Sequence, residues 1–346
     1  MAYKFMLNKI VEDDCKFIIK NIKLNKFKKK KILILGGNSF IASYIQTVLS
    51  LINCQITSVS LNKPKGIIKE IKKSNFRFIK ADLNDEKKIK KILGKKFDFI
   101  FHLATYGQPK KWKKNELSTI HLNINLLKNV LNHSVKYKSR ILYMSSAAVY
   151  ELSKKDELIK EYSKLSVGSF DSEIIYANSK IIGEQLCRIY REKFKIPVYV
   201  VRPAHTYGPG QDFKDPRVIP QLIKRAFLSK YIYLLDKGKS VRTWGYILDI
   251  TMMILNIIQF GKSSIYNVSG NDHKSILQVT KIIAKLFNGK KIMINNKKLT
   301  YTNSKPTTLK ISSKKYNLEF KNEFKTSFIN GIVKTINWNR TWQKLN

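Results

Sequence analysis

A tyrosine and a lysine four residues apart are the first candidates for chemistry in this chain. Tyr176 and Lys180 begin a proline-free segment whose apolar residues recur at helical spacing: Ile181, Ile182 and Leu186. Residues four apart share one face of a helix, so the phenol and the ammonium point to the same side. A nearby cation lowers the pKa of a phenol. Such a phenol can exchange a proton with a sugar hydroxyl while hydride moves to or from a nicotinamide.

The spacing alone is not specific, because the chain is rich in lysine. The same Tyr-x-x-x-Lys pattern occurs at Tyr106/Lys110, Tyr150/Lys154, Tyr233/Lys237 and Tyr301/Lys305. At those four places we expect a solvated lysine beside a half-buried tyrosine. What distinguishes Tyr176 is the set of motifs that precedes it, so the elements that carry those motifs decide the interpretation.

The first of these motifs is a strand that turns into a helix. Residues 31–35 are an apolar run typical of a buried strand, and Gly36 to Ser43 then open a helix. Free amides at a helix N-terminus hold pyrophosphate, so this turn is a candidate dinucleotide loop. A full glycine pattern would have glycine at 36, 39 and 42, whereas the chain has Gly36, Ser39 and Ala42. An ordinary strand-to-helix turn is the alternative.

The end of the second strand bears on the choice of cofactor. Binding of NAD usually places Asp or Glu there, on the ribose 2′-hydroxyl. Residues 56–60 instead run into Ser60, Asn62 and Lys63, which could accept the 2′-phosphate of NADP. The sequence therefore leaves NAD and NADP both open.

Further strands are expected at 76–83, 97–104 and 140–144, separated by helical segments. This alternation predicts an α/β fold with a doubly wound parallel sheet of the Rossmann type. Ser145 and Ser146 follow the last of these strands, at the sheet edge where such folds bind ligands. His102 lies inside an apolar run and is expected to be a core residue.

Composition limits the alternatives. The 346 residues suggest two domain-sized units, and the three scattered cysteines favour a reducing cytoplasm and no metal cluster. We find no secretory signal and no apolar run long enough for a membrane helix. The net charge of +42 raises the possibility of nucleic-acid binding. Because the lysines are spread evenly among Ile and Asn, we interpret the charge as compositional drift and expect no specific nucleic-acid or membrane partner.

The ordered set of motifs resembles the extended short-chain dehydrogenase/reductase family, in its NAD(P)-dependent sugar-nucleotide epimerase/dehydratase branch. The resemblance covers about residues 31–338. It is carried by Gly36 to Ala42, Ala81 to Leu83, Phe101 to Ala104, Ser145 to Tyr150, Tyr176 to Lys180, Arg202 to Gly210 and Val241 to Asp249.

The resemblance implies a division of the chain. Residues 32–203 would form the dinucleotide-binding Rossmann domain, and residues 204–346 mainly a smaller C-terminal domain for the sugar nucleotide. A strand near 266–268 would return to the main sheet. Residues 1–31 are expected to be an N-terminal appendage, with one helical face lined by Ile10, Phe17, Ile18 and Ile22.

The resemblance also implies roles for single residues. Ser146, Tyr176 and Lys180 would be catalytic, with Lys180 also binding the nicotinamide ribose. Cofactor contacts would come from Gly36, Asn38, Ser39, Phe40, Ile41, Ser60, Asn62, Lys63, Asp82, Leu83, Leu103, Ala104, Thr105, Asn123, Ser145, Tyr176, Lys180 and Pro203. Substrate contacts would come from Ser146, Ala147, His205, Arg217 and Arg242. A surface ion pair with Asp249 is the alternative for Arg242.

Departures from the family pattern narrow the reaction. Dehydratases of this branch carry Asp and Glu directly after the serine, and the decarboxylases keep a Glu, whereas this chain has Ala147 and Ala148. Alanine cannot transfer protons, so we expect a sugar-nucleotide epimerase acting at C4 through a keto intermediate. An NADPH-dependent 4-keto-sugar reductase is the alternative, and a catalytically inactive nucleotide-binding protein of the same fold comes third. The family leads us to expect a homodimer.

Overall fold

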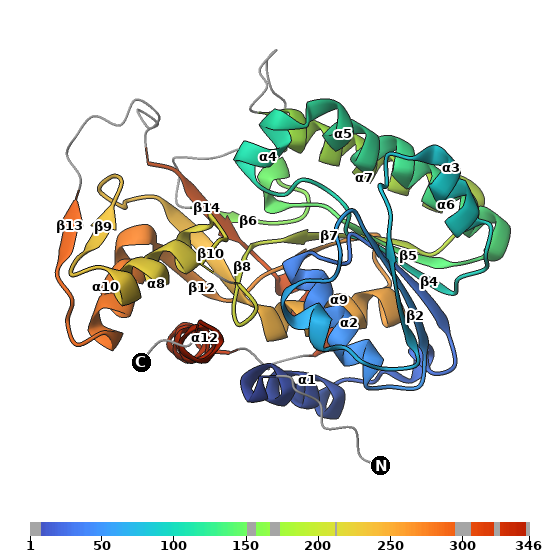
Figure 1. The fold of residues 1–346 in the computed structure, drawn as a ribbon. Coiled ribbons are helices and arrows are strands. Elements are labelled where there is room, and N and C mark those ends of the chain that lie inside the picture. Colours follow the sequence, from blue (N-terminus) through green and yellow to red (C-terminus); the bar gives the residue numbers. More distant parts are fainter. Residues whose placement is uncertain are drawn as a thin grey trace.

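The computed structural model describes residues 8–150, 157–166, 174–211, 213–294, 306–321 and 326–343. Its centre is a seven-stranded, all-parallel sheet with the strand order β11-β7-β5-β4-β1-β2-β3 (Figure 1). The strands are β1 (Lys31–Leu35), β2 (Gln55–Ser60), β3 (Phe76–Lys80), β4 (Phe99–His102), β5 (Arg140–Met144), β7 (Val198–Pro203) and β11 (Ile265–Val268). The predicted doubly wound α/β fold is confirmed.

The central strands β1, β4 and β5 are mainly apolar and buried because helices cover both faces of the sheet. Side chains alternate along β1, so Ile32 and Ile34 enter one core while Leu33 and Leu35 enter the other. The helices on the Leu33 side are α3 (Glu86–Leu93), α5 (Glu116–Ile120), α6 (Leu126–Tyr137) and α7 (Ile175–Phe194); those on the Ile32 side are α1 (Lys9–Asn21), α2 (Phe40–Ser50) and α9 (Ile247–Phe260). His102 is fully buried in β4, as expected of a core residue.

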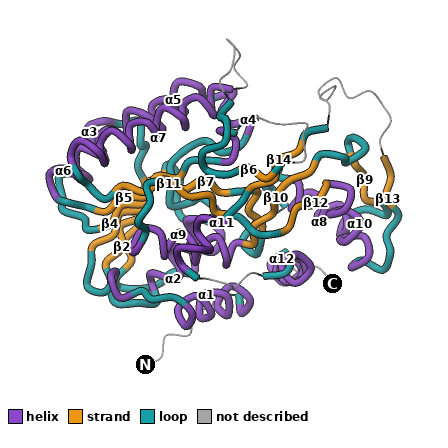
Figure 2. Tube along the Cα trace, turned by 180° about the vertical axis from the view of Figure 1, so that it is seen from behind, coloured by secondary structure: helices purple, strands orange, loops and turns teal. Residues whose placement is uncertain are grey.

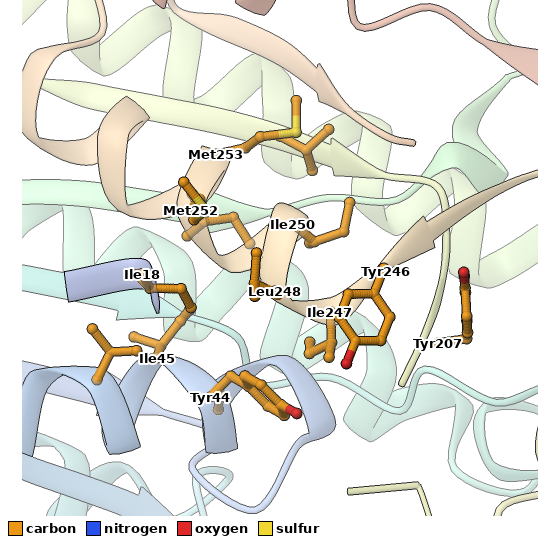
Figure 3. Packing of buried hydrophobic residues seen from close by; sticks show 14 of the residues in the cluster. Ile18, Tyr44, Ile45, Tyr207, Tyr246, Ile247, Leu248, Ile250, Met252 and Met253 are labelled. Atoms are coloured by element: carbon orange, nitrogen blue, oxygen red, sulfur yellow. The ribbon is translucent and has the colours of Figure 1, made fainter. Parts of the chain in front are cut away.

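Helix α1 belongs to the core, which differs from the expected appendage. Val11, Cys15 and Ile18 are fully buried, and Ile18 belongs to the same core cluster as Ile45 of α2 and Leu248 of α9 (Figure 3). Of the expected apolar face, Ile18 is buried and Ile10 and Ile22 pack against the same core. Only Phe17 was misplaced: it is 40 % exposed, because the fully buried stripe follows the spacing 11, 15, 18. Residues 1–7 lie outside the described part of the chain.

A buried carboxylate explains why the stripe of α1 was hard to recognise. Asp14 lies on it and accepts hydrogen bonds from the hydroxyls of Tyr246 (2.6 Å) and Tyr44 (3.4 Å) and from Lys334 Nζ (2.6 Å). Lys334 belongs to α12 (Phe328–Trp342), which lies next to α1 in both views (Figures 1 and 2). Asp14 thus joins the two ends of the chain to the core.

The second unit is smaller and lies beyond the carboxyl end of β7. Its sheet has the order β12-β10-β14-β6, with β8 paired to β10, and β13 pairs with β9 separately. The strands are β6 (Leu158–Ile159), β8 (His205–Tyr207), β9 (Ile232–Leu234), β10 (Val241–Tyr246), β12 (Asp272–Ser275), β13 (Ile292–Ile294) and β14 (Thr308–Ile311), with α8 (Val218–Leu228), α10 (Ile276–Leu286) and α11 (Lys314–Phe320). Strand β11 lies in the main sheet beside β7. No helix in the described ranges has the length and apolar character needed to cross a bilayer.

Candidate active site

The turn between β1 and α2 is shaped by two glycines. Gly36 has φ +86°, and a Cβ there would lie 2.7 Å from the backbone of Ala104. A Cβ on Gly37 would lie 2.0 Å from the hydroxyl oxygen of Ser58. Only glycine fits at this close approach of β1, β2 and β4. Ser39 is the N-cap of α2 and its side chain makes no cap hydrogen bond, so the first turn of α2 can present amides to a phosphate.

Side-chain amides hold this turn in place. Asn38 donates through Nδ2 to the carbonyls of Asn62 (2.9 Å) and Lys63 (3.0 Å), which ties the turn to the loop after β2. Gln46 of α2 donates to the carbonyls of Gly37 (2.8 Å) and Ala42 (2.9 Å) from below. Sequence reasoning did not single out Gln46, which is fully buried under the turn.

The other expected cofactor residues lie at the carboxyl ends of adjacent strands. Ser60 ends β2, Asp82 and Leu83 follow β3, Leu103 to Thr105 follow β4, and Pro203 ends β7. Two buried polar atoms here have no hydrogen-bond partner among the described residues: the hydroxyl oxygen of Thr105 and the Oδ1 atom of Asn38. A glycine cradle, a helix N-terminus and unused polar atoms along one edge fit a bound dinucleotide.

The structure brings Tyr176, Lys180 and Ser146 together. The hydroxyl of Ser146, just beyond β5, forms a hydrogen bond with the Tyr176 phenol. Lys180 lies one turn along α7, with Nζ 5.9 Å from the Tyr176 ring centroid and 4.7 Å from that of Tyr143. Its Nζ donates to the carbonyl of Met144 at 2.6 Å. The expected side-by-side arrangement of phenol and ammonium on one helix face is therefore present.

The pKa shift of Tyr176 differs in direction from the expectation. Burial raises the pKa of Tyr176, and only the hydrogen bond from Ser146 opposes that rise. Burial also lowers the pKa of Lys180 to about 7, opposed by the charge of Glu184. The ammonium is directed to a main-chain carbonyl instead of the phenol, so the predicted lowering of the tyrosine pKa by Lys180 is wrong for the chain alone.

Asn123 lies behind Tyr176 on a π-helical turn, His121–Asn125, between α5 and α6. Its Nδ2 donates to the hydroxyl of Ser179 at 2.9 Å, and Ser179 in turn donates to the carbonyl of Tyr176. These bonds attach the first turn of α7 to the neighbouring helix. Such π turns are frequent at functional sites.

A buried ion pair holds α7 against the sheet. Glu184 of α7 binds Arg202 of β7 through two oxygens (2.8 and 2.5 Å) and accepts from Ser145 at 2.5 Å. Arg202 also donates to the hydroxyl of Tyr150 (2.9 Å), which donates to Asn267 of β11 (2.6 Å). Glu184 was missed in the sequence, although it stands four residues after Lys180, on the same face of α7.

Three expected substrate residues gather at the second unit. His205 of β8 is exposed to solvent. Its pKa is lowered, first by partial loss of hydration and then by the charges of Arg242 and Arg217. Arg217 pairs with Asp215 and lies 5.5 Å from the Phe40 ring centroid at the start of α2. The second unit therefore meets the dinucleotide turn at this point.

Arg242 forms hydrogen bonds that the sequence analysis did not predict. Its Nη atoms donate to the carbonyl (2.8 Å) and the hydroxyl (2.8 Å) of Thr307, just before β14. Asp249, the ion-pair partner considered above, accepts from the amide of Thr326 at 2.8 Å.

The two alanines directly after Ser146 differ in exposure: Ala147 is buried and Ala148 is exposed.

One aromatic residue near Tyr176 was not predicted. Trp112 of α4 (Pro109–Lys114) stacks on the Tyr176 ring with centroids 4.6 Å apart and planes 10° apart. The available signal was a single apolar residue in the basic run Pro-Lys-Lys-Trp-Lys-Lys. The described residues contain no cluster of side chains suited to hold a metal ion.

The fold and the site define a dinucleotide-binding enzyme of the extended short-chain dehydrogenase/reductase class. The model of the NAD dependent epimerase/dehydratase family matches residues 32–269. The chain therefore belongs to the NAD dependent epimerase/dehydratase family. Its cofactor class is nicotinamide dinucleotide.

Two curated relatives illustrate the range of the family. The bifunctional polymyxin resistance protein ArnA of Wigglesworthia glossinidia brevipalpis is 32 % identical over 284 residues, which are 78 % of this chain and 43 % of that protein. The chain thus spans less than half of that relative. The dTDP-4-dehydro-6-deoxy-D-allose reductase of a Streptomyces species is 25 % identical over 268 residues, 75 % of this chain and 82 % of the relative.

A solved structure shows the same fold. The UDP-glucose 4-epimerase of Thermotoga maritima, solved with UDP-glucose, matches with a TM-score of 0.80 at 20 % identity, and the match covers 90 % of this chain and 99 % of that one. At this identity the similarity shows only that the fold is shared, and the reaction must be inferred from the residues of the site.

Proposed function

We propose that this protein is a sugar-nucleotide epimerase that inverts C4 of a nucleotide-diphosphate sugar through a transient 4-keto sugar. The observation that carries the proposal is the Tyr176–Ser146 hydroxyl pair, which lies at the carboxyl edge of a sheet that also carries the dinucleotide turn. Residues 32–203 would bind the cofactor, and residues 204–346 would bind most of the sugar nucleotide.

In this proposal Tyr176 takes the proton of the C4 hydroxyl and later returns it to the same oxygen. Ser146 donates a hydrogen bond to that oxygen and keeps it next to the phenol. A bound nicotinamide supplies the hydride acceptor and donor. Lys180 has a pKa near 7 and can hold or release a proton at neutral pH. When the lysine is charged, it stabilises the Tyr176 phenolate. General acid–base catalysis of this kind contributes about 10²–10⁴-fold.

The diphosphate would be bound by cations near the junction of the two units. Arg217 lies beside Phe40 at the start of α2, and Arg242 lies on β10, close enough for both charges to act on His205. Guanidinium groups bind phosphate oxygens bidentately, which suits them to this task. His205, uncharged at neutral pH, can then donate or accept one hydrogen bond to the sugar.

Elimination of water is disfavoured at this site. A 4,6-dehydration needs an added acid and base next to the serine, and Ala147 and Ala148 occupy those positions. Among the residues that the structure describes, Glu184 of α7 is engaged by Arg202 and Ser145. The groups that remain, Ser146, Tyr176 and Lys180, support oxidation and reduction at a single sugar carbon.

The loop after β2 favours a second candidate, an NADPH-dependent 4-keto-sugar reductase. Strand β2 ends at Ser60 without an acidic residue, and Asn38 holds the Asn62–Lys63 backbone beside the dinucleotide turn. A lysine there suits a 2′-phosphate. A reductase would use the same Tyr176 to protonate the carbonyl oxygen once, and would consume the reduced cofactor.

One experiment separates the two candidates. The purified protein is denatured, any released nicotinamide is identified by mass spectrometry, and a panel of nucleotide sugars and 4-keto sugars is assayed with NAD and with NADPH. Epimerisation without net change in nicotinamide absorbance supports the epimerase. Stoichiometric NADPH oxidation with a keto sugar would contradict the epimerase and support the reductase. Absence of nicotinamide binding in calorimetry would contradict both and leave a non-catalytic role.

Assembly and location are further parts of the proposal. A homodimer is expected of this family and is tested by light scattering at several protein concentrations. We also expect a cytoplasmic protein without a specific nucleic-acid partner. Oligonucleotide binding that depends on sequence would contradict the latter.

A further inference from the structure

Helix α4 has an unusual distribution of side chains. None of its residues is buried, and its four lysines, Lys110, Lys111, Lys113 and Lys114, are all exposed. Trp112 is its only apolar residue that turns inward. A helix that buries so little apolar surface is held mainly by that one side chain.

The partner of Trp112 is the proposed catalytic tyrosine itself. The two rings are stacked nearly parallel, 4.6 Å apart, so the indole covers one face of the phenol. Tyr176 is only 7 % exposed, while its hydroxyl remains in contact with Ser146. The indole therefore blocks water from the ring face and leaves the hydroxyl edge beside the serine.

The indole N–H provides an independent sign of a binding site. Trp112 Nε1 is buried and has no hydrogen-bond partner among the described residues. A buried donor is normally satisfied, so an unpartnered one beside the proposed catalytic residue needs an explanation, and a bound ligand that accepts from it would supply one. Stacking alone would not require a tryptophan, because a phenylalanine ring fills a similar apolar role without an N–H.

We propose that Trp112 is a positioning residue of the active site: its indole forms one wall of the sugar-binding site and shields the Tyr176 phenol from water. This deepens the proposed function and rests on it for the identity of the ligand. The shielding also accounts for the burial that raises the Tyr176 pKa. Removing the indole should hydrate the phenolate and shift Tyr176 towards its ordinary titration.

The first test needs neither cofactor nor turnover. The protein is prepared with ¹³C at the Cζ atom of tyrosine, and Tyr176→Phe identifies the resonance of Tyr176. In Trp112→Ala we expect Tyr176 to titrate at lower pH than in the wild type. Trp112→Phe keeps a stacked ring and should restore the wild-type titration. Trp342→Phe, on α12 and outside the site, is the matched control and should change nothing.

The second test addresses the sugar site. UDP-glucose and UDP-glucuronic acid are titrated calorimetrically into each variant in the presence of saturating NAD. We expect Trp112→Ala to weaken binding about tenfold, because it loses both the aromatic wall and the N–H, while NAD affinity stays unchanged. The pH profile of turnover should shift in the same direction as the titration.

The outcomes distinguish the two levels of inference. A Tyr176 titration and a sugar affinity that are unchanged in Trp112→Ala would overturn the role of Trp112. Equal losses in Trp112→Ala and Trp342→Phe would also overturn it, because they would indicate a general loss of fold. If the wild type binds no nucleotide sugar but Tyr176 still titrates at lower pH in Trp112→Ala, the shielding is confirmed and the proposed function is refuted.

Discussion

At the scale of single residues, the least expected feature is the state of Lys180. Its ammonium is fully buried and donates to the Met144 carbonyl, with the acidic Glu184 already engaged by Arg202. Burial lowers the Lys180 pKa from 10.5 to about 7. The lysine is therefore poised to change charge near neutral pH, which suits a group that stabilises a phenolate during only part of the reaction.

Stability should report this lowered pKa. Between about pH 7 and 10.5 the unfolded chain binds a proton at Lys180 that the folded chain does not, so this group makes the free energy of unfolding rise with pH. In Lys180→Met that contribution is gone. We expect the stability difference, wild type minus Lys180→Met, to increase by about 3 kcal/mol from pH 7 to pH 9.5, at about 1.4 kcal/mol per pKa unit.

Urea unfolding at the two pH values measures this difference. Lys281→Met, at an exposed lysine of α10, serves as the control and should show a nearly constant difference. Parallel pH dependences for Lys180→Met and the wild type would show that Lys180 keeps its ordinary pKa.

Some residue-scale features could be predicted from the sequence and others could not. The Tyr176–Lys180 pairing depends on helical spacing, which is local, and the Ser146 contact depends on where parallel strands end. The direction of the Tyr176 pKa shift depends on how much protein surrounds the phenol. Trp112 supplies part of that cover from 64 positions earlier in the chain, and no local pattern reveals such a contact.

At the scale of elements, helix α7 is fixed to the sheet by the Glu184–Arg202 pair. Removing one partner of a buried pair leaves the other charge without compensation. We expect Glu184→Ala to lower the free energy of unfolding by about 3–5 kcal/mol. It should also reduce turnover, because Ser145, next to Ser146, loses its acceptor.

The same helix offers a matched comparison. Arg188 and Glu192 form an ion pair one turn apart on its exposed face, at 2.7 Å. Glu192→Ala should cost less than about 1 kcal/mol, because water screens and solvates exposed charges. Urea denaturation of both variants measures the contrast, and similar losses would show that Glu184 contributes no more than a surface pair.

Element types were predicted well because their signals are local. Short apolar runs indicated the buried parallel strands, and glycine at 36 indicated the tight turn before α2. The π turn that directs Asn123 to Ser179 was not predicted, because it depends on how the helices on either side pack. Arg242 likewise binds Thr307, which lies 65 residues later in the chain and is brought close by the pairing of β10 with β14.

At the scale of the whole molecule, helix α1 closes the core beside α2 and α9 and is bound to α12 through Asp14. The sequence suggested an appendage because the resemblance to the family begins only at about residue 31. In the folded chain Asp14 of α1 is the link, as it reaches Tyr246 and Lys334. Long-range partners of this kind cannot be recognised from the helix alone.

Two neighbouring residues of α1 test this packing. Ile18 is fully buried, whereas Phe17 is 40 % exposed. We expect Ile18→Ala to destabilise the protein by about 2–5 kcal/mol, since it leaves a cavity between α1, α2 and α9. Phe17→Ala should cost clearly less. Thermal unfolding of both variants measures the difference, and a larger effect at Phe17 would restore the face first expected from the sequence.

The central claim is that Tyr176 transfers the proton at the sugar carbon that is oxidised and reduced. The most direct measurement compares the turnover of nucleotide sugars by the wild type and by Tyr176→Phe, with nicotinamide binding followed in the same samples by calorimetry. We predict C4 inversion by the wild type without net change in nicotinamide absorbance, and a loss of about 10²–10⁴-fold in Tyr176→Phe with cofactor binding retained. Turnover by Tyr176→Phe within a few-fold of the wild type, or loss of cofactor binding together with activity, would contradict the account.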